Sequence, residues 1–159
     1  MVRHPSITFA AAALVAAALA GPVQAAGSTD NTSNYDSADT SETYQAGMDA
    51  ANAGNWDLAI TKFTVATTEA PDDAEAFNML AYSYRNKGDY DQAFRYYEKA
   101  LALDPDNANA HEYVGEAYLA VDDVAMAEQH LAKLEEICWL GCEQYDELDE
   151  AIDSYKASH

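Results

Sequence analysis

A period of 34 residues runs through most of this chain and constrains its fold more than any other feature. Ala59, Ala93 and Ala127 are 34 residues apart, and the same step separates Pro71 from Pro105. Further positions that keep the step are Gly47, Ala81 and Gly115; Phe63, Tyr97 and Leu131; Ala66, Ala100 and Leu134; and Gly54 and Gly88. A fixed period of this length indicates stacked repeats, each of which is one supersecondary unit.

Each period is predicted to hold two helices joined by a short turn. Gly54 and Gly88 lie between the helices, where glycine supplies the left-handed conformation past a helix end, and Asp122 stands where a third glycine is expected. Pro71 and Pro105 end the second helix of a unit. Small residues let the two helices approach closely, and they are Gly47, Ala81 and Gly115 with Ala59, Ala93 and Ala127. Larger side chains fill the remaining space, and they are Trp56, Tyr90 and Val124 with Phe63, Tyr97 and Leu131.

The segment from Ala74 to Asn107 resembles a tetratricopeptide repeat (TPR) along its whole length. The residues at the family's spacing are Phe77, Leu80, Ala81, Tyr84, Gly88, Tyr90, Ala93, Tyr97, Ala100 and Pro105. The first unit is a weaker match, with Thr43 and Ala46 at positions of bulky residues, and the third lacks the terminal proline. The resemblance implies an all-α fold, an α-solenoid of three helix-turn-helix repeats over residues 40–73, 74–107 and 108–138.

A capping helix is predicted over residues 142–157, so that the TPR domain spans 41–157. Its apolar positions follow a helical stripe of Tyr145, Leu148, Ile152 and Tyr155, and acidic residues occupy the other faces. The acidic face is interpreted as a solvated outer surface. A docking strip for a basic partner is the alternative.

The first 25 residues have the three-part layout of a secretory signal peptide. A short basic start contains Arg3, an apolar stretch follows, and small residues precede a predicted cleavage after Ala25. An uncleaved membrane anchor is the alternative interpretation. Residues 26–40 are rich in Ser, Thr, Asn and Asp and are predicted to be a disordered polar linker. The chain is therefore expected to be an exported, bacterial-type protein, periplasmic or secreted, without a membrane span after cleavage.

The charge balance excludes one class of partner. The chain has a net charge of -20, with 8 Lys and Arg against 28 Asp and Glu. Nucleic-acid binding needs clustered Lys and Arg to neutralise phosphates, and this chain offers the opposite field. Basic partners, cations or a need for solubility in salt all remain compatible with the acidity.

Two cysteines, Cys138 and Cys142, lie between the last repeat and the cap. An even number of closely spaced cysteines in an exported chain favours a disulfide. A metal site, a redox-active pair and free buried thiols are the other interpretations. Gly141 permits the sharp bend that the bridge needs.

The TPR resemblance implies a concave groove lined by the first helix of each repeat. The predicted partner-binding residues are Tyr44, Met48, Asn52, Asn78, Tyr82, Arg85, Asn86, Glu112, Glu116 and Leu119. Arg85 is hypothesised to hold a carboxylate of a peptide, with Asn78 or Asn86 on its backbone. The alternative is that Arg85 pairs with a surface acid and Tyr82 packs between repeats. The lysines of the family's carboxylate-clamp members are missing, so binding of chaperone tails is not assigned.

No catalytic constellation, metal-ligand set or phosphate loop is recognisable, so we expect no enzymatic activity, no metal and no cofactor. The leading hypothesis is an exported protein-interaction module, an adaptor or scaffold that binds a peptide or protein in its groove as a monomer. The alternative is a structural or solubility role of an acidic envelope protein without a specific peptide ligand.

Overall fold

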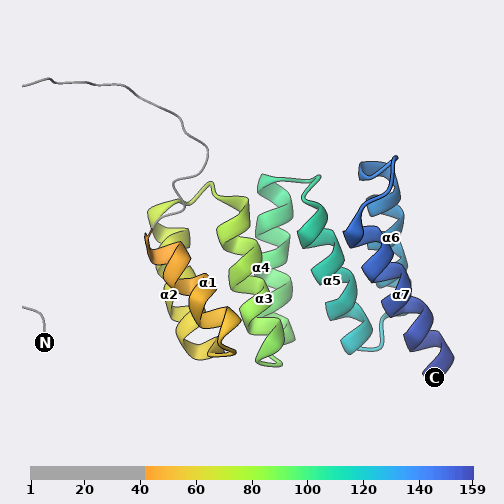
Figure 1. The fold of residues 1–159 in the computed structure, drawn as a ribbon, viewed down its shortest axis with the longest axis horizontal. Helices are drawn as coiled ribbons and strands as arrows, with labels where there is room; N and C mark the ends of the chain where they lie inside the picture. The colour runs from red at the N-terminus through yellow and green to blue at the C-terminus, as the bar shows by residue number, and fades with distance from the viewer. Residues whose placement is uncertain (1–41) are drawn as a thin grey trace, which may run out of the picture. The chain divides into compact units, whose positions relative to one another are not determined.

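The computed structural model describes residues 42–159, and every regular element in that range is an α-helix. The helices are α1 (Glu42–Asn52), α2 (Trp56–Glu69), α3 (Ala74–Asn86), α4 (Tyr90–Leu103), α5 (Ala108–Ala120), α6 (Val124–Ile137) and α7 (Glu143–Ser158). They form three helical hairpins followed by α7, which confirms the predicted all-α solenoid (Figure 1).

Asparagine and aspartate side chains start most of these helices. Each accepts a hydrogen bond from a backbone N–H of the first turn, which would otherwise lack a partner. The capping residues of α2 to α6 are Asn55, Asp73, Asp89, Asn107 and Asp123. These caps keep the 34-residue step, so part of the repeat signal is a signal for helix starts.

The turn inside each hairpin has one residue in the left-handed region. Gly54 and Gly88 have φ of 68° and 82°, as predicted. Asp122 takes the third position with φ of 65°, a conformation that Asp tolerates better than most side chains. Its carboxylate accepts a hydrogen bond of 2.6 Å from the hydroxyl of Tyr155 in α7, so the cap supports this turn.

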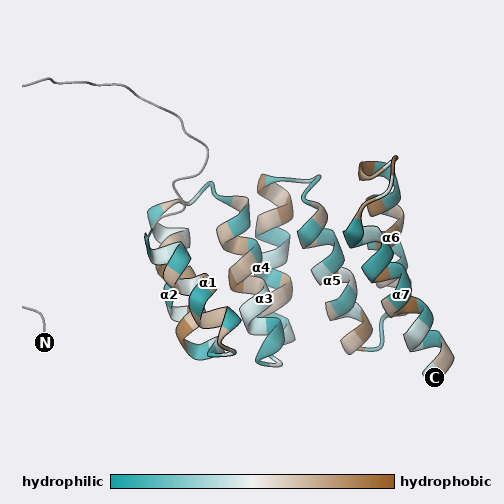
Figure 2. Cartoon of the chain, viewed as in Figure 1, coloured by the Kyte–Doolittle hydropathy of each residue, from teal (hydrophilic) through white to brown (hydrophobic). Residues whose placement is uncertain are grey.

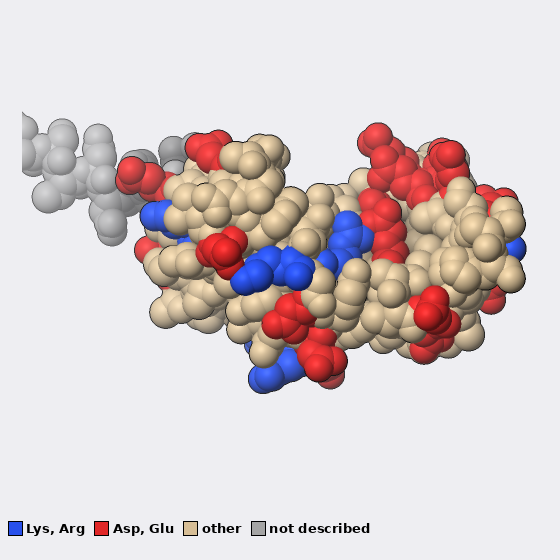
Figure 3. All heavy atoms as spheres, turned by 90° about the horizontal axis from the view of Figure 1, so that it is seen from below, with Lys and Arg blue, Asp and Glu red and all other residues tan. Residues whose placement is uncertain are grey.

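The helices of residues 42–159 form two layers (Figure 1). Helices α1, α3, α5 and α7 contact one another in sequence along one layer, and α2, α4 and α6 pack behind them. The exposed side of the first layer is hollowed in space-filling view (Figure 3), and we call it the concave face.

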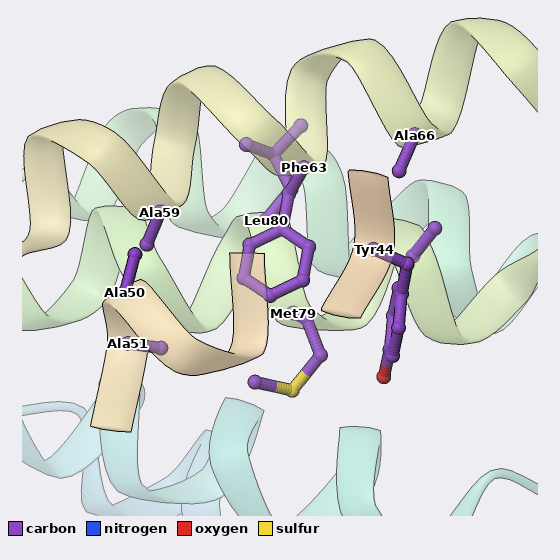
Figure 4. Close-up of a cluster of buried hydrophobic side chains, with 9 residues drawn as sticks. Tyr44, Ala50, Ala51, Ala59, Phe63, Ala66, Met79 and Leu80 are labelled. Carbon is purple, nitrogen blue, oxygen red and sulfur yellow. The ribbon is translucent and has the colours of Figure 1, made fainter. Parts of the chain in front are cut away.

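The core of the first hairpin is built as the sequence predicts. Phe63 is fully buried, and its ring fills the space opposite Gly47, where a Cβ atom would lie 2.7 Å from it. Tyr44 packs edge-on against Phe63 with ring centroids 5.4 Å apart, and Leu80 of α3 closes the cluster (Figure 4).

The third hairpin departs from the prediction. Leu131, expected to fill the space in this hairpin, is only half-buried. A Cβ atom at Gly115 would lie 2.5 Å from Leu148, so the small residue of α5 receives a side chain from α7 instead of α6. Leu148 and Ile152 of the cap are almost fully buried, which shows that α7 completes the last repeat.

The predicted signal peptide, residues 1–25, and linker, residues 26–40, lie outside the described residues and stay predictions. Within residues 42–159, no helix is both long enough and apolar enough to cross a membrane.

Candidate partner-binding face

The structure brings the predicted groove residues to α1, α3 and α5, but it does not expose all of them. Tyr44, Asn78, Glu112 and Leu119 are buried, with exposed fractions of 8% or less. Leu119 belongs to the core that the cap completes. Met48, Tyr82, Arg85 and Glu116 are half-buried, and Asn52 and Asn86 are exposed. The outward stripe is therefore narrower than predicted, because each neighbouring hairpin covers part of it.

Arg85 is the centre of the concave face and is already occupied. Its guanidinium forms an ion pair with the carboxylate of Glu116 in the next repeat. The guanidinium carbon also lies 5.1 Å from the ring centre of Tyr82 and 5.5 Å from that of Tyr113, within range of a cation–π interaction. The structure therefore shows the alternative stated above, in which Arg85 pairs with an acid of this chain.

The tyrosines join three successive repeats. Tyr82 lies between Trp56 and Tyr113, with ring centroids 5.9 Å and 4.8 Å away. Tyr113 is not among the predicted binding residues, since it lies one residue from the predicted stripe. These rings give the concave face its apolar floor.

The two candidate amides are also used within the chain. The side-chain N–H of Asn86 donates to the backbone oxygen of Tyr82 at 2.9 Å. The side-chain N–H of Asn78 donates to the Glu75 carboxylate at 3.3 Å, and Asn78 is fully buried. The hypothesis that either amide holds a peptide backbone is not supported by this arrangement.

Three carboxylates meet where α5 faces α7. Glu112 is 5% exposed, and it lies beside Glu147 of α7 and Glu116 of its own helix. Burial first, and then the charges of Glu147 and Glu116, raise the pKa of Glu112 to about 8. The raised pKa favours the protonated form of Glu112, which also interacts with Glu147 through a side-chain hydrogen bond.

Glu147 is one of the acidic residues of α7 that the sequence predicts to form a solvated outer face. The 34-residue period would place the counterpart of Glu112 at Asp146, but the loop before α7 is one residue longer than the loop before α5. That extra residue brings Glu147 to the groove. The length of the loop before α7, compared with the 34-residue period, is the signal that could have predicted this position for Glu147.

Acidic side chains gather on the α7 side of the hollow in Figure 3. A cleft of about 300 Å³ is lined by Arg85, Asn86, Tyr90, Glu116 and Ala120. The concave face thus combines an aromatic floor with an acidic wall, which is chemistry suited to a cation carried on an apolar stem.

The two histidines of the repeats face each other behind this face. His111 Nδ1 and His130 Nδ1 are 2.9 Å apart, and burial lowers the pKa of both side chains, that of His130 to about 4. No group of three or more His, Cys, Asp or Glu side chains that could hold a metal ion is found in the described part of the chain.

The structure joins Cys138 to Cys142 in a disulfide, with 5.6 Å between the Cα atoms. Gly141 has φ of 89°, as the bend requires. The bridge sits at the end of α6, and Cys142 is the residue directly before α7.

Comparison with known protein families matches two overlapping segments of the chain. Family models described as tetratricopeptide repeat match residues 74–107 and 96–129. No curated protein sequence matches the chain.

Solved structures match the fold over most of the chain. The TPR2B domain of yeast Sti1, in a complex with pHsp70, is 21% identical with a TM-score of 0.68, covering 74% of this chain and 96% of that one. The first TPR of Spaghetti (RPAP3), bound to the HSP90 peptide SRMEEVD, is 20% identical with a TM-score of 0.63, covering 70% and 91%. PcrH, in complex with the chaperone-binding region of PopD, is 20% identical with a TM-score of 0.65, covering 73% and 90%.

Proposed function

Because this chain is a tetratricopeptide-repeat protein, we propose that it is an interaction module whose concave face binds a segment of another protein. The partner segment carries a lysine or arginine that lies beside Glu112 and Glu147, next to the site where Arg85 pairs with Glu116 over the Tyr82 and Tyr113 rings. The similar folds of the Sti1 and RPAP3 domains, solved with pHsp70 and with an HSP90 peptide, support binding on this kind of scaffold.

The single observation that carries the choice of a cationic partner is the buried Glu112 carboxyl. Its proton is held only because two further carboxylates and low solvation disfavour the charge. An ammonium or guanidinium group placed beside Glu112 lowers the pKa of this carboxyl, because the ionised form then gains a partner of opposite charge. Binding of a cation is therefore coupled to loss of the proton from Glu112.

An acidic peptide is disfavoured on the same face. Arg85 is the cation that such a peptide would need, and Glu116 already pairs with it. The RPAP3 domain is solved with the peptide SRMEEVD, which is acidic. We infer that this chain differs from that domain in the charge of the segment it selects.

Export is part of the proposal. It is supported by the signal-peptide pattern of residues 1–25 and by the disulfide, which persists in oxidising compartments. Edman sequencing of the chain recovered from the cell envelope tests it, and a mature end at Ala26 is the expected result.

A structural or solubility role is the second candidate. It is favoured by the internal pairing of Arg85 with Glu116 and of Asn86 with the Tyr82 backbone, which leaves little of the face unpaired. In that case no peptide binds, and folding weakens at low salt because acidic side chains repel one another.

The test is selection of a randomised peptide library on the purified chain, followed by calorimetry with the enriched peptides. We expect Lys- or Arg-containing peptides, and roughly tenfold weaker binding to Glu147→Gln. Glu150→Gln is the matched control, since it changes an exposed acid elsewhere on α7. Calorimetry at pH 7 in buffers of different ionisation enthalpy should show proton release on binding. Enrichment of acidic peptides, or equal binding by Glu147→Gln, would contradict the proposal.

A further inference from the structure

The loop between α6 and α7 exposes two large apolar side chains. Trp139 and Leu140 are each 80% exposed, whereas the other exposed large apolar residues of the described chain do not exceed 43%. The ribbon at the end of α6, where the loop begins, has the colour of hydrophobic residues in Figure 2. We call residues 138–142 the tip. Neither the core nor the concave face makes use of it.

The tip is held in one shape. The Cys138–Cys142 disulfide closes it, and the backbone N–H of Gly141 donates to the oxygen of Cys138 at 2.6 Å. The helices α6 and α7 fix both ends of the loop. Little conformational entropy remains to be lost when such a loop enters a binding site, which favours binding through it.

An unfilled cleft lies elsewhere on the molecule, where α4 meets α5 and α6. Its volume is about 530 Å³, and it is lined by Phe94, Arg95, Tyr97, Glu98, Leu101, Ala102, Val114, Tyr118 and His130. Phe94 and Tyr118 stack with ring centroids 4.5 Å apart, and Tyr118 stacks on His130 at 5.7 Å. The equivalent of His130 one repeat earlier is Tyr96, whose larger ring stacks on Tyr84 at 5.5 Å. Because the imidazole of His130 is smaller than a tyrosine ring, it leaves space open that Tyr96 fills at the equivalent position of the preceding repeat.

The hydrogen bonds of the histidine pair determine what His130 presents to the cleft. The backbone oxygen of Pro105 can only accept, so the His111 Nε2, 3.0 Å away, carries the hydrogen. In neutral His111 the Nδ1 atom is then an acceptor, and it receives the N–H of His130 Nδ1. Neutral His130 therefore has an unprotonated Nε2, an acceptor on a residue that lines the cleft together with aromatic, aliphatic and charged side chains.

We propose that the tip of one copy of this chain docks in the cleft of a second copy. Trp139 enters among Phe94, Tyr118 and His130 and donates its indole N–H to His130 Nε2. Leu140 covers Leu101 and Ala102.

A matching donor and acceptor are thus found on the same molecule. The indole needs an acceptor when it is buried, and the cleft supplies one with aromatic walls. The rim of the cleft has one charge that complements the tip, Arg95, and one that does not, Glu98. Arg95 lines the cleft, and no carboxylate of the described residues lies within ion-pairing distance of it. Glu136 and Glu143 flank the tip in sequence and are exposed.

The net charge of -20 sets how this contact behaves. Two such chains repel at long range, and salt screens that repulsion within roughly 10 Å at 0.1 M. Self-docking therefore strengthens as salt rises, in contrast to binding of a basic peptide on the concave face. The contact is also small and belongs to the weak, transient class of interfaces.

Sedimentation velocity of the full-length chain, and of the chain without residues 1–25, tests the proposal between micromolar and millimolar concentration. We expect the weight-average sedimentation coefficient to rise with concentration, more so in 0.5 M than in 0.05 M NaCl. The double substitution Trp139→Ala with Leu140→Ala, which removes the tip, should weaken association at least about tenfold. Ala102→Glu, at an exposed position of the cleft, should do the same.

Complementation separates this docking from a loss of folding. Each variant alone self-associates at least about tenfold more weakly than the native chain, but a mixture restores a one-to-one complex, because one chain keeps its cleft and the other its tip. Trp139 emission should shift to shorter wavelength as the complex forms, over the constant background of Trp56, the other tryptophan.

Three results would overturn the proposal. One is a sedimentation coefficient independent of concentration in both salts. Another is a tip variant that associates like the native chain. The third is a monomer whose Trp139 emission shifts only on zwitterionic lipid vesicles, which would assign the tip to a membrane surface.

Discussion

The first and the last hairpin solve the same packing problem in different ways. In the first, the space beside Gly47 is filled from within by Phe63 of α2. In the last, the space beside Gly115 is filled by Leu148 of α7, outside the hairpin. A single repeating pattern of small residues thus supports one self-contained hairpin and one that depends on its neighbour.

The difference shows what α7 contributes. Stacked repeats share their cores, and a terminal unit must obtain its missing contacts from a capping element. Here the cap supplies Leu148 and Ile152 to the core and the Tyr155 hydroxyl to the turn at Asp122. It also supplies Glu147 to the concave face. Stability and the candidate site therefore depend on the same helix.

Removal of α7 is expected to have the largest effect. Truncation after Cys142 exposes the core around Gly115 and should lower the free energy of unfolding by more than about 5 kcal/mol, since two buried aliphatic side chains are lost. Circular dichroism melts should show α5 and α6 unfolding before the first two hairpins. A single unfolding transition of the truncated chain at the melting temperature of the native chain would contradict the dependence of the last hairpin on α7.

Truncating one buried side chain in each region tests the same difference between the first and the last hairpin. Phe63→Ala is expected to cost about 3–5 kcal/mol and Leu148→Ala about 2–5 kcal/mol, as for other buried side chains of their size. Urea denaturation measures the totals. Amide exchange should then place the damage of Phe63→Ala in α1 and α2, and that of Leu148→Ala in α5, α6 and α7. Exchange that rises everywhere alike would show that the hairpins unfold as one unit.

Adding a methyl group at Gly47 or at Gly115 tests the same difference in packing with a smaller change in stability. Gly47→Ala meets the aromatic ring of Phe63 and should cost about 1–3 kcal/mol from overpacking. Gly115→Ala meets the terminal methyl groups of Leu148, which can rotate away. The better helix propensity of alanine then offsets much of the strain, and a net cost below about 1 kcal/mol is expected. Equal losses in thermal melts would contradict the difference in partner.

A pH-dependent effect is expected from Glu112 of the last hairpin, whose pKa is raised. From about pH 4.5 to about 8 the folded chain binds a proton that the unfolded chain has released, so stability falls as pH rises through this window. Glu112→Gln removes that slope and should be the more stable protein at pH 9 by about 1–2 kcal/mol. The other groups that face it are Glu147, Glu116 and Arg85. Parallel stability curves for the variant and the native chain would be evidence against the buried proton.

The period alone predicted most of the fold, because it records contacts made inside one hairpin. Gly54, Gly88, Phe63 and Tyr97 all lie where the pattern places them. Leu131 and Leu119 do not, since their burial is decided by the next helix in the stack. The pattern of a single unit does not contain that information.

The candidate site was harder to predict than the fold for the same reason. Arg85 pairs with Glu116 across repeats, and Tyr82 lies between rings from both neighbouring hairpins. Glu147 reaches the concave face only because of one extra residue in the loop before α7. Residue type pointed to an interface, but which groups are already paired is a property of the stack.

The disulfide of the tip also affects how the two ends of the array open. Helix α1 can detach from α2 by breaking noncovalent contacts, whereas the first turn of α7 stays tied to α6 through Cys138 and Cys142. After a local opening event, α7 therefore recloses from a short tether instead of searching as a free segment. Reduction of the disulfide should speed amide exchange in α7 and leave exchange in α1 unaffected. The Cys138–Cys142 bond therefore governs the rate of local opening at the C-terminal end of the array only.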